Sequence, residues 1–85
     1  EPVHGTAPKY AGADRANPTA ILFSSVLMLY HINESAAAQR LEEAVAAVIK
    51  EGVHVTRDLT PPNAAGDPAG TQAMGRAVRD KIHSL

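Results

Sequence analysis

Residues 19–32, TAILFSSVLMLYHI, constrain the fold more than any other stretch of this 85-residue chain. Asn17 and Pro18 precede them and predict a helix start, with Asn17 as the N-cap and Pro18 at the first helical position. The helix that follows is apolar on almost every face, and helices of this kind are normally enclosed by protein. Because a chain of this length has little other material to enclose it, we expect the helix to pack against something larger.

The charge balance excludes two classes of partner. Eight Lys and Arg residues oppose nine Asp and Glu residues, and neither sign is gathered into a block. A nucleic-acid or membrane-surface binder would show a basic patch, so no nucleic acid and no membrane is predicted as a partner. The apolar stretch is also too short to cross a bilayer, and it lies inside the chain, unlike a signal peptide.

Cysteine and histidine usage bears on metal binding and on the cellular compartment. The chain has no cysteine and therefore no disulfide. Its four histidines are scattered, and none falls in an HExxH or HxxxH spacing, so no metal ligand is predicted. The lack of cysteine and of a signal sequence fits a cytoplasmic protein, and a mature protein of the mitochondrial matrix would have the same composition.

Further segments complete the predicted architecture. A second helix is expected over residues 34–51 and is ended by Gly52, and a third begins near Thr71. Residues 53–59 predict a short strand or extended segment, and the proline-containing residues 60–70 predict a loop. The fold class is therefore mainly α, with a long loop, three helices and at most one short strand. The apolar stripe of the second helix is predicted to comprise Ala37, Leu41, Ala44, Val45, Val48 and Ile49, and that of the third Met74, Val78, Ile82 and Leu85.

Ser24 and Ser25 lie in the apolar helix and carry hydroxyl groups that a catalytic site could use as nucleophiles. No nearby residue is an evident activating base. Serines inside helices commonly donate to the backbone carbonyl one turn earlier. We therefore expect both hydroxyls to bond the backbone, and we predict no catalytic residue in this chain.

Residues 1–17, EPVHGTAPKYAGADRAN, have the composition of a loop that could hold a cofactor. Gly5 and Gly12 permit a close approach of the backbone to a ligand. Lys9 and Arg15 add positive charge, and Tyr10 adds a hydroxyl donor on an apolar ring, which suits a phosphate-bearing cofactor. The alternative is a surface loop that happens to contain these residues. Composition alone favours that alternative, because neither GxGxxG nor a Walker sequence is present.

The motifs HGTAP, AG and NPTA occur together near the start of the chain, followed by LMLYH, LEEAVAAVIKEG and TRDL. In this order and spacing they closely resemble the C-terminal part of the β-decarboxylating dehydrogenases, a family that includes isocitrate, isopropylmalate and homoisocitrate dehydrogenases. The resemblance covers essentially the whole chain. It implies the C-terminal cofactor-binding portion of the large domain of an enzyme with an α/β, isopropylmalate dehydrogenase-like fold. It divides the chain into a cofactor loop (1–17), a helical hairpin with a short extended segment (18–59), a loop (60–70) and a terminal helix (71–85).

The resemblance also implies which residues bind the cofactor. Asn17 would lie against the adenine edge, and Lys9 and Tyr10 match the positions that hold the 2′-phosphate in NADP-dependent isocitrate dehydrogenases. NAD-dependent members tend to have an acidic and an aliphatic residue there. A phosphate dianion needs a cation and a hydroxyl donor, whereas a carboxylate holds a ribose diol well, so the pair indicates NADP, with NAD as the alternative. The adenosine and phosphate groups would be lined by His4, Gly5, Thr6, Ala7 and Pro8.

The segment around Arg57 departs from the NADP-dependent pattern. Bacterial NADP enzymes carry a tyrosine in the place of Arg57 and an arginine in the place of Pro61. Arg57 would replace one phosphate contact with another, and the second contact would be lost. The sequence TRDL also occurs in many NAD-dependent and isopropylmalate-type members. It therefore favours in part the hypothesis that this chain belongs to one of those members.

The family's chemistry requires groups that do not map onto this chain. By resemblance, the whole enzyme oxidises a 2-hydroxy acid by hydride transfer and decarboxylates it with Mg²⁺ or Mn²⁺ as the Lewis acid. The arginines that bind substrate, the aspartates that bind metal, and the Tyr and Lys that transfer protons lie upstream or in the neighbouring subunit of a homodimer. We therefore expect this chain to bind cofactor and not to turn over substrate alone.

Three hypotheses stay open at this point. In the first, the chain is part of an NADP-dependent isocitrate dehydrogenase, which converts isocitrate to 2-oxoglutarate in the tricarboxylic acid cycle. In the second, it is part of an NAD-dependent isocitrate dehydrogenase or of an isopropylmalate or homoisocitrate dehydrogenase. The third is of another class, a small non-catalytic helical interaction module whose apolar first helix is a docking surface.

Overall fold

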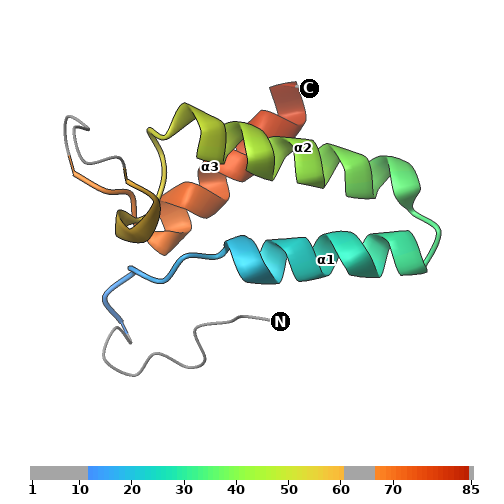
Figure 1. Cartoon of the computed structure of the whole chain (residues 1–85), viewed down its shortest axis with the longest axis horizontal. Helices are drawn as coiled ribbons and strands as arrows, with labels where there is room; N and C mark the ends of the chain where they lie inside the picture. Colours follow the sequence, from blue (N-terminus) through green and yellow to red (C-terminus); the bar gives the residue numbers. More distant parts are fainter. Residues whose placement is uncertain (1–11, 61–66, 85) are drawn as a thin grey trace.

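The structure, a computed structural model, describes residues 12–60 and 67–84, which form three α-helices and one turn of 3₁₀-helix. The helices are α1 (Thr19–His31), α2 (Ser35–Glu51) and α3 (Thr71–Ser84), and the 3₁₀ turn is η2 (Arg57–Leu59). α1 and α2 form an antiparallel hairpin, and α3 packs against α2 (Figure 1). The two described ranges contain no strand, so the predicted mainly α fold class with three helices is confirmed.

α1 begins one residue later than the sequence predicts. The first helical hydrogen bond runs from the Leu22 N–H to the Pro18 carbonyl at 3.1 Å, which puts Pro18 at the N-cap position. Asn17 still binds the helix end, because its Oδ1 accepts a hydrogen bond of 2.9 Å from the Thr19 N–H. Asn17 therefore satisfies one of the free donors at the start of α1 from a position just outside the helix.

α2 has an apolar face and a charged face. The predicted stripe is wrong at Ala37, which is exposed, while its neighbour Ala38 is fully buried. Both alanines stand within one turn of Leu41, and a methyl group is too small for the periodic pattern to distinguish them. Gly52 ends the helix in the left-handed conformation, with φ 67°, as predicted. The buried residues of α2 are Ala38, Ala44, Val45 and Val48.

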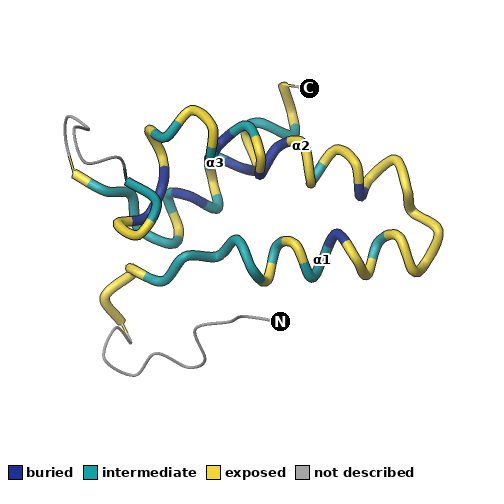
Figure 2. Tube along the Cα trace, in the orientation of Figure 1, coloured by how far each residue is buried: buried dark blue, intermediate teal, exposed yellow. Residues whose placement is uncertain are grey.

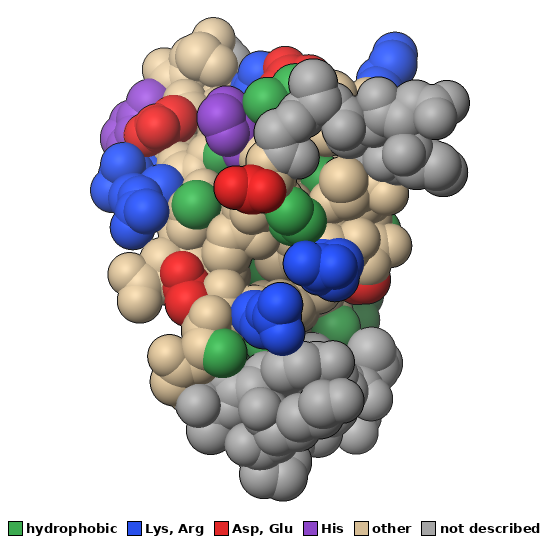
Figure 3. All heavy atoms as spheres, turned by 90° about the vertical axis from the view of Figure 1, so that its left-hand side faces the viewer, with side chains coloured by type: hydrophobic (Ala, Val, Ile, Leu, Met, Phe, Trp, Pro, Cys, Tyr) green, Lys and Arg blue, Asp and Glu red, His purple; other side chains and the backbone are tan. Residues whose placement is uncertain are grey.

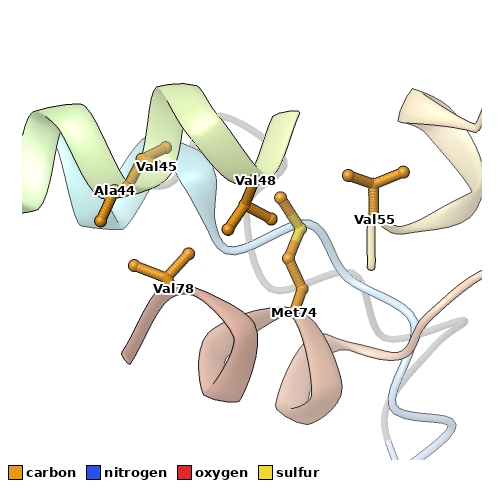
Figure 4. Close-up of a cluster of buried hydrophobic side chains, with 6 residues drawn as sticks. All are labelled: Ala44, Val45, Val48, Val55, Met74 and Val78. Carbon is orange, nitrogen blue, oxygen red and sulfur yellow. The ribbon is translucent and has the colours of Figure 1, made fainter. Parts of the chain in front are cut away.

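The hydrophobic core lies between α3 and the second half of α2 (Figure 4). α3 contributes Met74 and Val78, whose side chains point toward α2, and Val55 joins them from the segment between the two helices. Each side chain of this core is at most 3% exposed, so shortening any of them would leave a cavity. The six core residues are Ala44, Val45, Val48, Val55, Met74 and Val78.

The segment after α2 is extended and then turns, without forming a strand. Val55 and Thr56 are buried, and Thr56 has extended backbone angles, with φ −68° and ψ 167°. The Val55 carbonyl accepts a hydrogen bond of 2.8 Å from the Ala69 N–H, which holds the residues before α3 against this segment. A strand needs a repeated ladder of such bonds. Of the predicted range 53–59, Val55 and Thr56 form the extended part, and the prediction is wrong over Arg57–Leu59, which form the 3₁₀ turn η2.

α1 leaves most of its apolar surface exposed. Within α1, which lies wholly in the described residues, only Val26 is buried, whereas Leu27 and Met28 are 71% and 55% exposed. Figure 2 shows that exposed and half-buried residues alternate along nearly the whole helix. The residues described here thus cover one side of a helix that is apolar all round. The exposed large apolar residues of α1 and of the turn after it are Ile21, Phe23, Leu27, Met28, Tyr30 and Ile32.

Two polar residues of α1 are satisfied within the helix. The hydroxyl of Ser24 donates to the Ala20 carbonyl at 3.1 Å, and that of Ser25 donates to the Ile21 carbonyl at 3.0 Å. The prediction that both serines bond the backbone one turn earlier is confirmed. Among the described residues, no helix has the length and apolar character needed to cross a membrane.

Candidate cofactor-binding site

The predicted cofactor loop is only partly within the described residues. Its last part, from Gly12 to Asn17, is described, and so is Arg57, a predicted site residue from η2. The candidate site is therefore built from the end of the loop, η2 and the start of α3. The other predicted site residues lie outside the described residues: His4, Gly5, Thr6, Ala7, Pro8, Lys9 and Tyr10.

Asn17 joins the end of the loop to η2. Its Nδ2 donates a hydrogen bond of 2.8 Å to Oδ2 of Asp58, which lies 41 residues further along the chain. Its Oδ1 accepts from the Thr19 N–H, so the two ends of the side-chain amide have different partners. Because an amide with both ends bonded has one orientation, Asn17 fixes the start of α1 relative to η2.

The Asp58 carboxylate is held on both oxygens. The Thr56 hydroxyl donates to Oδ1 of Asp58 at 2.5 Å, and Thr56 itself is fully buried. The Thr60 hydroxyl donates to the Thr56 carbonyl at 2.9 Å, which closes the turn on its other side. These bonds order the η2 backbone. They thereby fix the position on the surface from which the exposed side chain of Arg57 projects.

Arg15 and Arg57 line one hollow, although they come from segments far apart in the chain. The hollow has a volume of about 360 Å³, and the residues before α3 form its other side. Figure 3 views this end of the molecule and shows basic side chains at its surface. Guanidinium groups bind phosphate oxygens through paired hydrogen bonds, so the two arginines suit a phosphate group. The other lining residues are Ala13, Asp14, Asp67, Pro68, Ala69 and Gly70.

The same hollow contains the carboxylates of Asp14 and Asp67. Oδ1 of Asp14 accepts a hydrogen bond of 2.9 Å from the Gln72 N–H at the start of α3, where the helix dipole favours a negative charge. Asp67 is exposed, as are Arg15 and Arg57, so water and salt screen all three charges alike. Arg15 and Arg57 are the cationic side chains of this hollow.

Asp14 has a structural partner that the sequence did not predict. Its carbonyl accepts from the Thr71 N–H at 3.1 Å, and its carboxylate accepts from Gln72, 58 residues away. A short sequence motif around Asp14 cannot predict that this residue caps a helix whose first residues lie so far along the chain. The only signal in the sequence is an aspartate between small residues ahead of a helix start, and ordinary turn chemistry accounts for that equally well.

A second hollow, of about 550 Å³, lies between the end of α2 and α3. None of the predicted site residues lines it, and Lys81 and Glu51 form an ion pair beside it. Within residues 12–60 and 67–84, no three His, Cys, Asp or Glu side chains are grouped so that they could hold a metal ion. Side chains of both signs line both hollows, and what sets the hollow at Arg15 and Arg57 apart is that it adjoins the predicted cofactor loop.

Asn17 and Asp58 are expected to be energetically coupled. Asn17→Ala removes the bond to Thr19 and the bond to Asp58, and should destabilise the protein by about 1 kcal/mol, as loss of a helix cap does. In a double-mutant cycle with Asp58→Ala, the two changes should be non-additive, with a coupling energy of about 1 kcal/mol. Hydrogen exchange at the amides of α1 and α2 in the full-length protein gives the free energy of opening for the parent and the three variants.

The control for this cycle pairs Asn17→Ala with Glu43→Ala, because Glu43 is exposed on α2 and has no part in the site. That second cycle should be additive to within about 0.5 kcal/mol. Additivity in the first cycle as well would mean that the bond between Asn17 and Asp58 contributes nothing to stability.

Comparison with known proteins identifies the class to which this fold and site belong. The family model for isocitrate/isopropylmalate dehydrogenase matches residues 1–78. The chain belongs to the isocitrate/isopropylmalate dehydrogenase family. The family resemblance stated from the motifs alone is thus confirmed.

Individual relatives carry two different names. The 3-isopropylmalate dehydrogenase of Symbiobacterium thermophilum is 48% identical over 84 residues, which are 98% of this chain and 22% of that protein. The isocitrate dehydrogenase (NAD) subunit alpha, mitochondrial, of Homo sapiens is 46% identical over 80 residues, 94% of this chain and 21% of that protein. The 3-isopropylmalate dehydrogenase of Methanothermobacter thermautotrophicus is 42% identical over 78 residues. The chain spans about a fifth of the length of the curated relatives it matches.

Proposed function

We propose that this chain is the C-terminal cofactor-binding portion of the large domain of an NADP-dependent isocitrate dehydrogenase. The observation that carries the proposal is the hollow shared by Arg15, at the end of the cofactor loop, and Arg57, in η2. By resemblance, both segments lie at the adenosine end of the dinucleotide. Two guanidinium groups there supply the positive charge that a 2′-phosphate requires.

The sequence of the loop supports the same cofactor. Lys9 and Tyr10 are a cation and a hydroxyl donor at the positions that, by resemblance, meet the 2′-phosphate. Pro61 stands where bacterial NADP enzymes have an arginine, so one phosphate contact of those enzymes is missing in this chain. Arg15 lines the hollow beside Arg57 and would provide a cation in its place.

Asn17 retains hydrogen-bonding groups for the adenine edge. Its side-chain amide has two N–H groups and two acceptor lone pairs, and the bonds to Asp58 and Thr19 use one of each. Its orientation is fixed by these bonds, so the remaining groups would be presented to the base without reorganisation. This agrees with the role that the resemblance gives to Asn17.

In the whole enzyme the bound cofactor would accept a hydride from a 2-hydroxy acid. The residues of this chain would bind and orient the adenosine end, while the catalytic groups and the ligands of Mg²⁺ or Mn²⁺ would come from other parts of a homodimeric, cytoplasmic enzyme. The apolar surface that α1 exposes would pack within the rest of an α/β large domain, since surfaces of this kind are usually covered.

A second candidate is a dehydrogenase that uses NAD, with isocitrate, isopropylmalate or homoisocitrate as substrate. The names of the relatives favour it, since they include an NAD-dependent isocitrate dehydrogenase and 3-isopropylmalate dehydrogenases. The wording TRDL around Arg57 favours it as well. Lys9 and Tyr10 speak against it, because a ribose diol is better held by a carboxylate.

The two candidates differ in a steady-state measurement. The full-length protein that contains this chain would be assayed with Mg²⁺, with NADP and with NAD, and with each of the three hydroxy acids. We expect the highest kcat/KM with isocitrate and NADP. A clear preference for NAD, or for another substrate, would select the second candidate. A folded protein with no activity in any combination would contradict both and favour the non-catalytic interaction module.

A further inference from the structure

The end of the cofactor loop is bonded directly to the first turn of α3. The Thr71 N–H donates to the Asp14 carbonyl at 3.1 Å, and the Gln72 N–H donates to Oδ1 of Asp14 at 2.9 Å. The Thr71 hydroxyl donates in turn to the Ala16 carbonyl. These bonds, together with the close approach of Gly70 to Asp14, are called the Asp14–α3 contact below.

Asp14 caps α3 from outside that helix. The Gly70 carbonyl accepts the first helical bond, 3.0 Å from the Met74 nitrogen, so Thr71 and Gln72 are the first two helical residues. The first four N–H groups of a helix have no partner within it. Asp14 supplies acceptors for two of them, one from its backbone and one from its side chain. The same two bonds that satisfy the helix also hold the loop.

The backbone on both sides is shaped for this approach. Asp14 has φ 56°, in the left-handed region that aspartate and asparagine tolerate better than most residues. On the α3 side, a Cβ atom added to Gly70 would lie 2.3 Å from Oδ2 of Asp14 and 2.6 Å from its carbonyl oxygen. No side chain fits at residue 70 unless Asp14 moves away.

We propose that Asp14 is a positioning residue. It acts on cofactor binding indirectly, by fixing the end of the cofactor loop to α3. The inference rests on the proposed cofactor-binding function of this chain. Asp14 precedes Arg15, which lines the hollow at Arg57, and Asp14 and Gly70 line that hollow as well. Loss of the Asp14–α3 contact would let Arg15 leave its place beside Arg57 in the hollow proposed to hold the phosphate.

The size of the effect follows from the fraction of molecules in which the loop is correctly placed. If only part of the population has the loop in its binding position, the apparent Kd rises by the inverse of that fraction. Residues 12–15 are exposed, so this part of the loop buries little surface against the rest of the described structure. Loss of a helix cap combined with a non-glycine residue forced into the left-handed region should therefore weaken cofactor binding by about five- to tenfold.

Three substitutions at Asp14 separate the cap from the backbone conformation. Asp14→Asn keeps the Oδ1 acceptor and the tolerance of positive φ, and should bind cofactor within about twofold of the parent protein. Asp14→Gly keeps the backbone conformation and loses the side-chain acceptor, and should be intermediate. Asp14→Ala loses both and should show the full loss of affinity. Gly70→Ala tests the contact from the α3 side and should also weaken binding.

Isothermal titration of each full-length variant with NADP and with NAD gives Kd, and steady-state kinetics give KM and kcat. We expect KM for the cofactor to rise with Kd while kcat at saturating cofactor stays near the parent value. Asp80→Ala, which removes an exposed α3 carboxylate paired with Arg79, is the control and should change neither.

The outcomes distinguish failure of the positioning role of Asp14 from failure of the proposed cofactor-binding function. A parent protein that binds neither dinucleotide would overturn both. A parent that binds one of them, with Asp14→Ala and Gly70→Ala binding it equally well, would overturn the positioning role alone. Equal losses in Asp14→Asn and Asp14→Ala would also overturn it, because they would make the negative charge, and not the cap, the cause.

Discussion

The double substitution Lys9→Asp with Tyr10→Ile should transfer the cofactor preference of the enzyme that contains this chain from NADP to NAD. The change removes the cation and the hydroxyl donor that are proposed to meet the 2′-phosphate. A hydrogen bond to a charged group contributes about 1.5–3 kcal/mol, so losing two should lower kcat/KM for NADP by at least about a hundredfold. The introduced carboxylate should raise kcat/KM for NAD, because it can accept from the ribose diol.

Conservative variants provide the controls for this reversal. Lys9→Arg keeps a cation, and Tyr10→Phe keeps the ring while removing the hydroxyl. The first should retain the preference for NADP, and the second should lose only the contribution of one hydrogen bond, about tenfold in kcat/KM. The ratio of kcat/KM for the two cofactors is measured with the full-length protein. A ratio unchanged in the double variant would exclude Lys9 and Tyr10 from the phosphate site.

The double variant should nevertheless keep some affinity for NADP. Arg15 and Arg57 line the hollow, and both guanidinium groups remain in the variant. The phosphate would then be held by cations from the loop end and from η2 alone. This residual affinity distinguishes a site with two separate sources of positive charge from one that depends on the loop only.

The helices could be predicted from the sequence because their signals are local. The apolar period over residues 34–51, the glycine that follows it and the polar loop before Thr71 each act within a few residues of one another. The same reasoning was weaker for Ala37, where two adjacent alanines fit the period and only the packing decides which is buried. It also could not choose between strand and extended segment near Val55, since that choice depends on a partner chain segment.

The site could be predicted only where the motif itself carries the information. Asn17 was recognised as a capping residue, but its bond to Asp58 spans 41 residues and leaves no trace in either local sequence. Asp14 escaped prediction for the same reason, since its partner Gln72 is 58 residues away. Contacts of this kind arise from how α2 and α3 place η2 and the start of α3 against the loop, so they become visible only with the fold.

The substitution Met74→Ala should have the largest effect on stability among the core residues. Met74 is fully buried between Val48 and Val55, and its side chain comes from the first turn after the Asp14–α3 contact (Figure 4). Truncation of a buried methionine to alanine typically costs about 2–5 kcal/mol, because it removes apolar contacts and leaves a cavity. Met74→Leu keeps nearly the same volume and should cost less than about 1.5 kcal/mol.

Hydrogen exchange is the appropriate measurement, because it reports the local opening of α3 whether or not the protein that contains this chain unfolds in one step. In Met74→Ala, the slowest amides of α2 and α3 should exchange roughly a hundredfold faster, corresponding to about 3 kcal/mol, while those in the exposed last turn of α1 change little. Equal protection in Met74→Ala and the parent would mean that other residues fill the space. Faster exchange confined to α3 and the loop end would instead indicate that the packing of Met74 and the position of Asp14 are coupled. Both residues contact the first turns of α3 or lie within them.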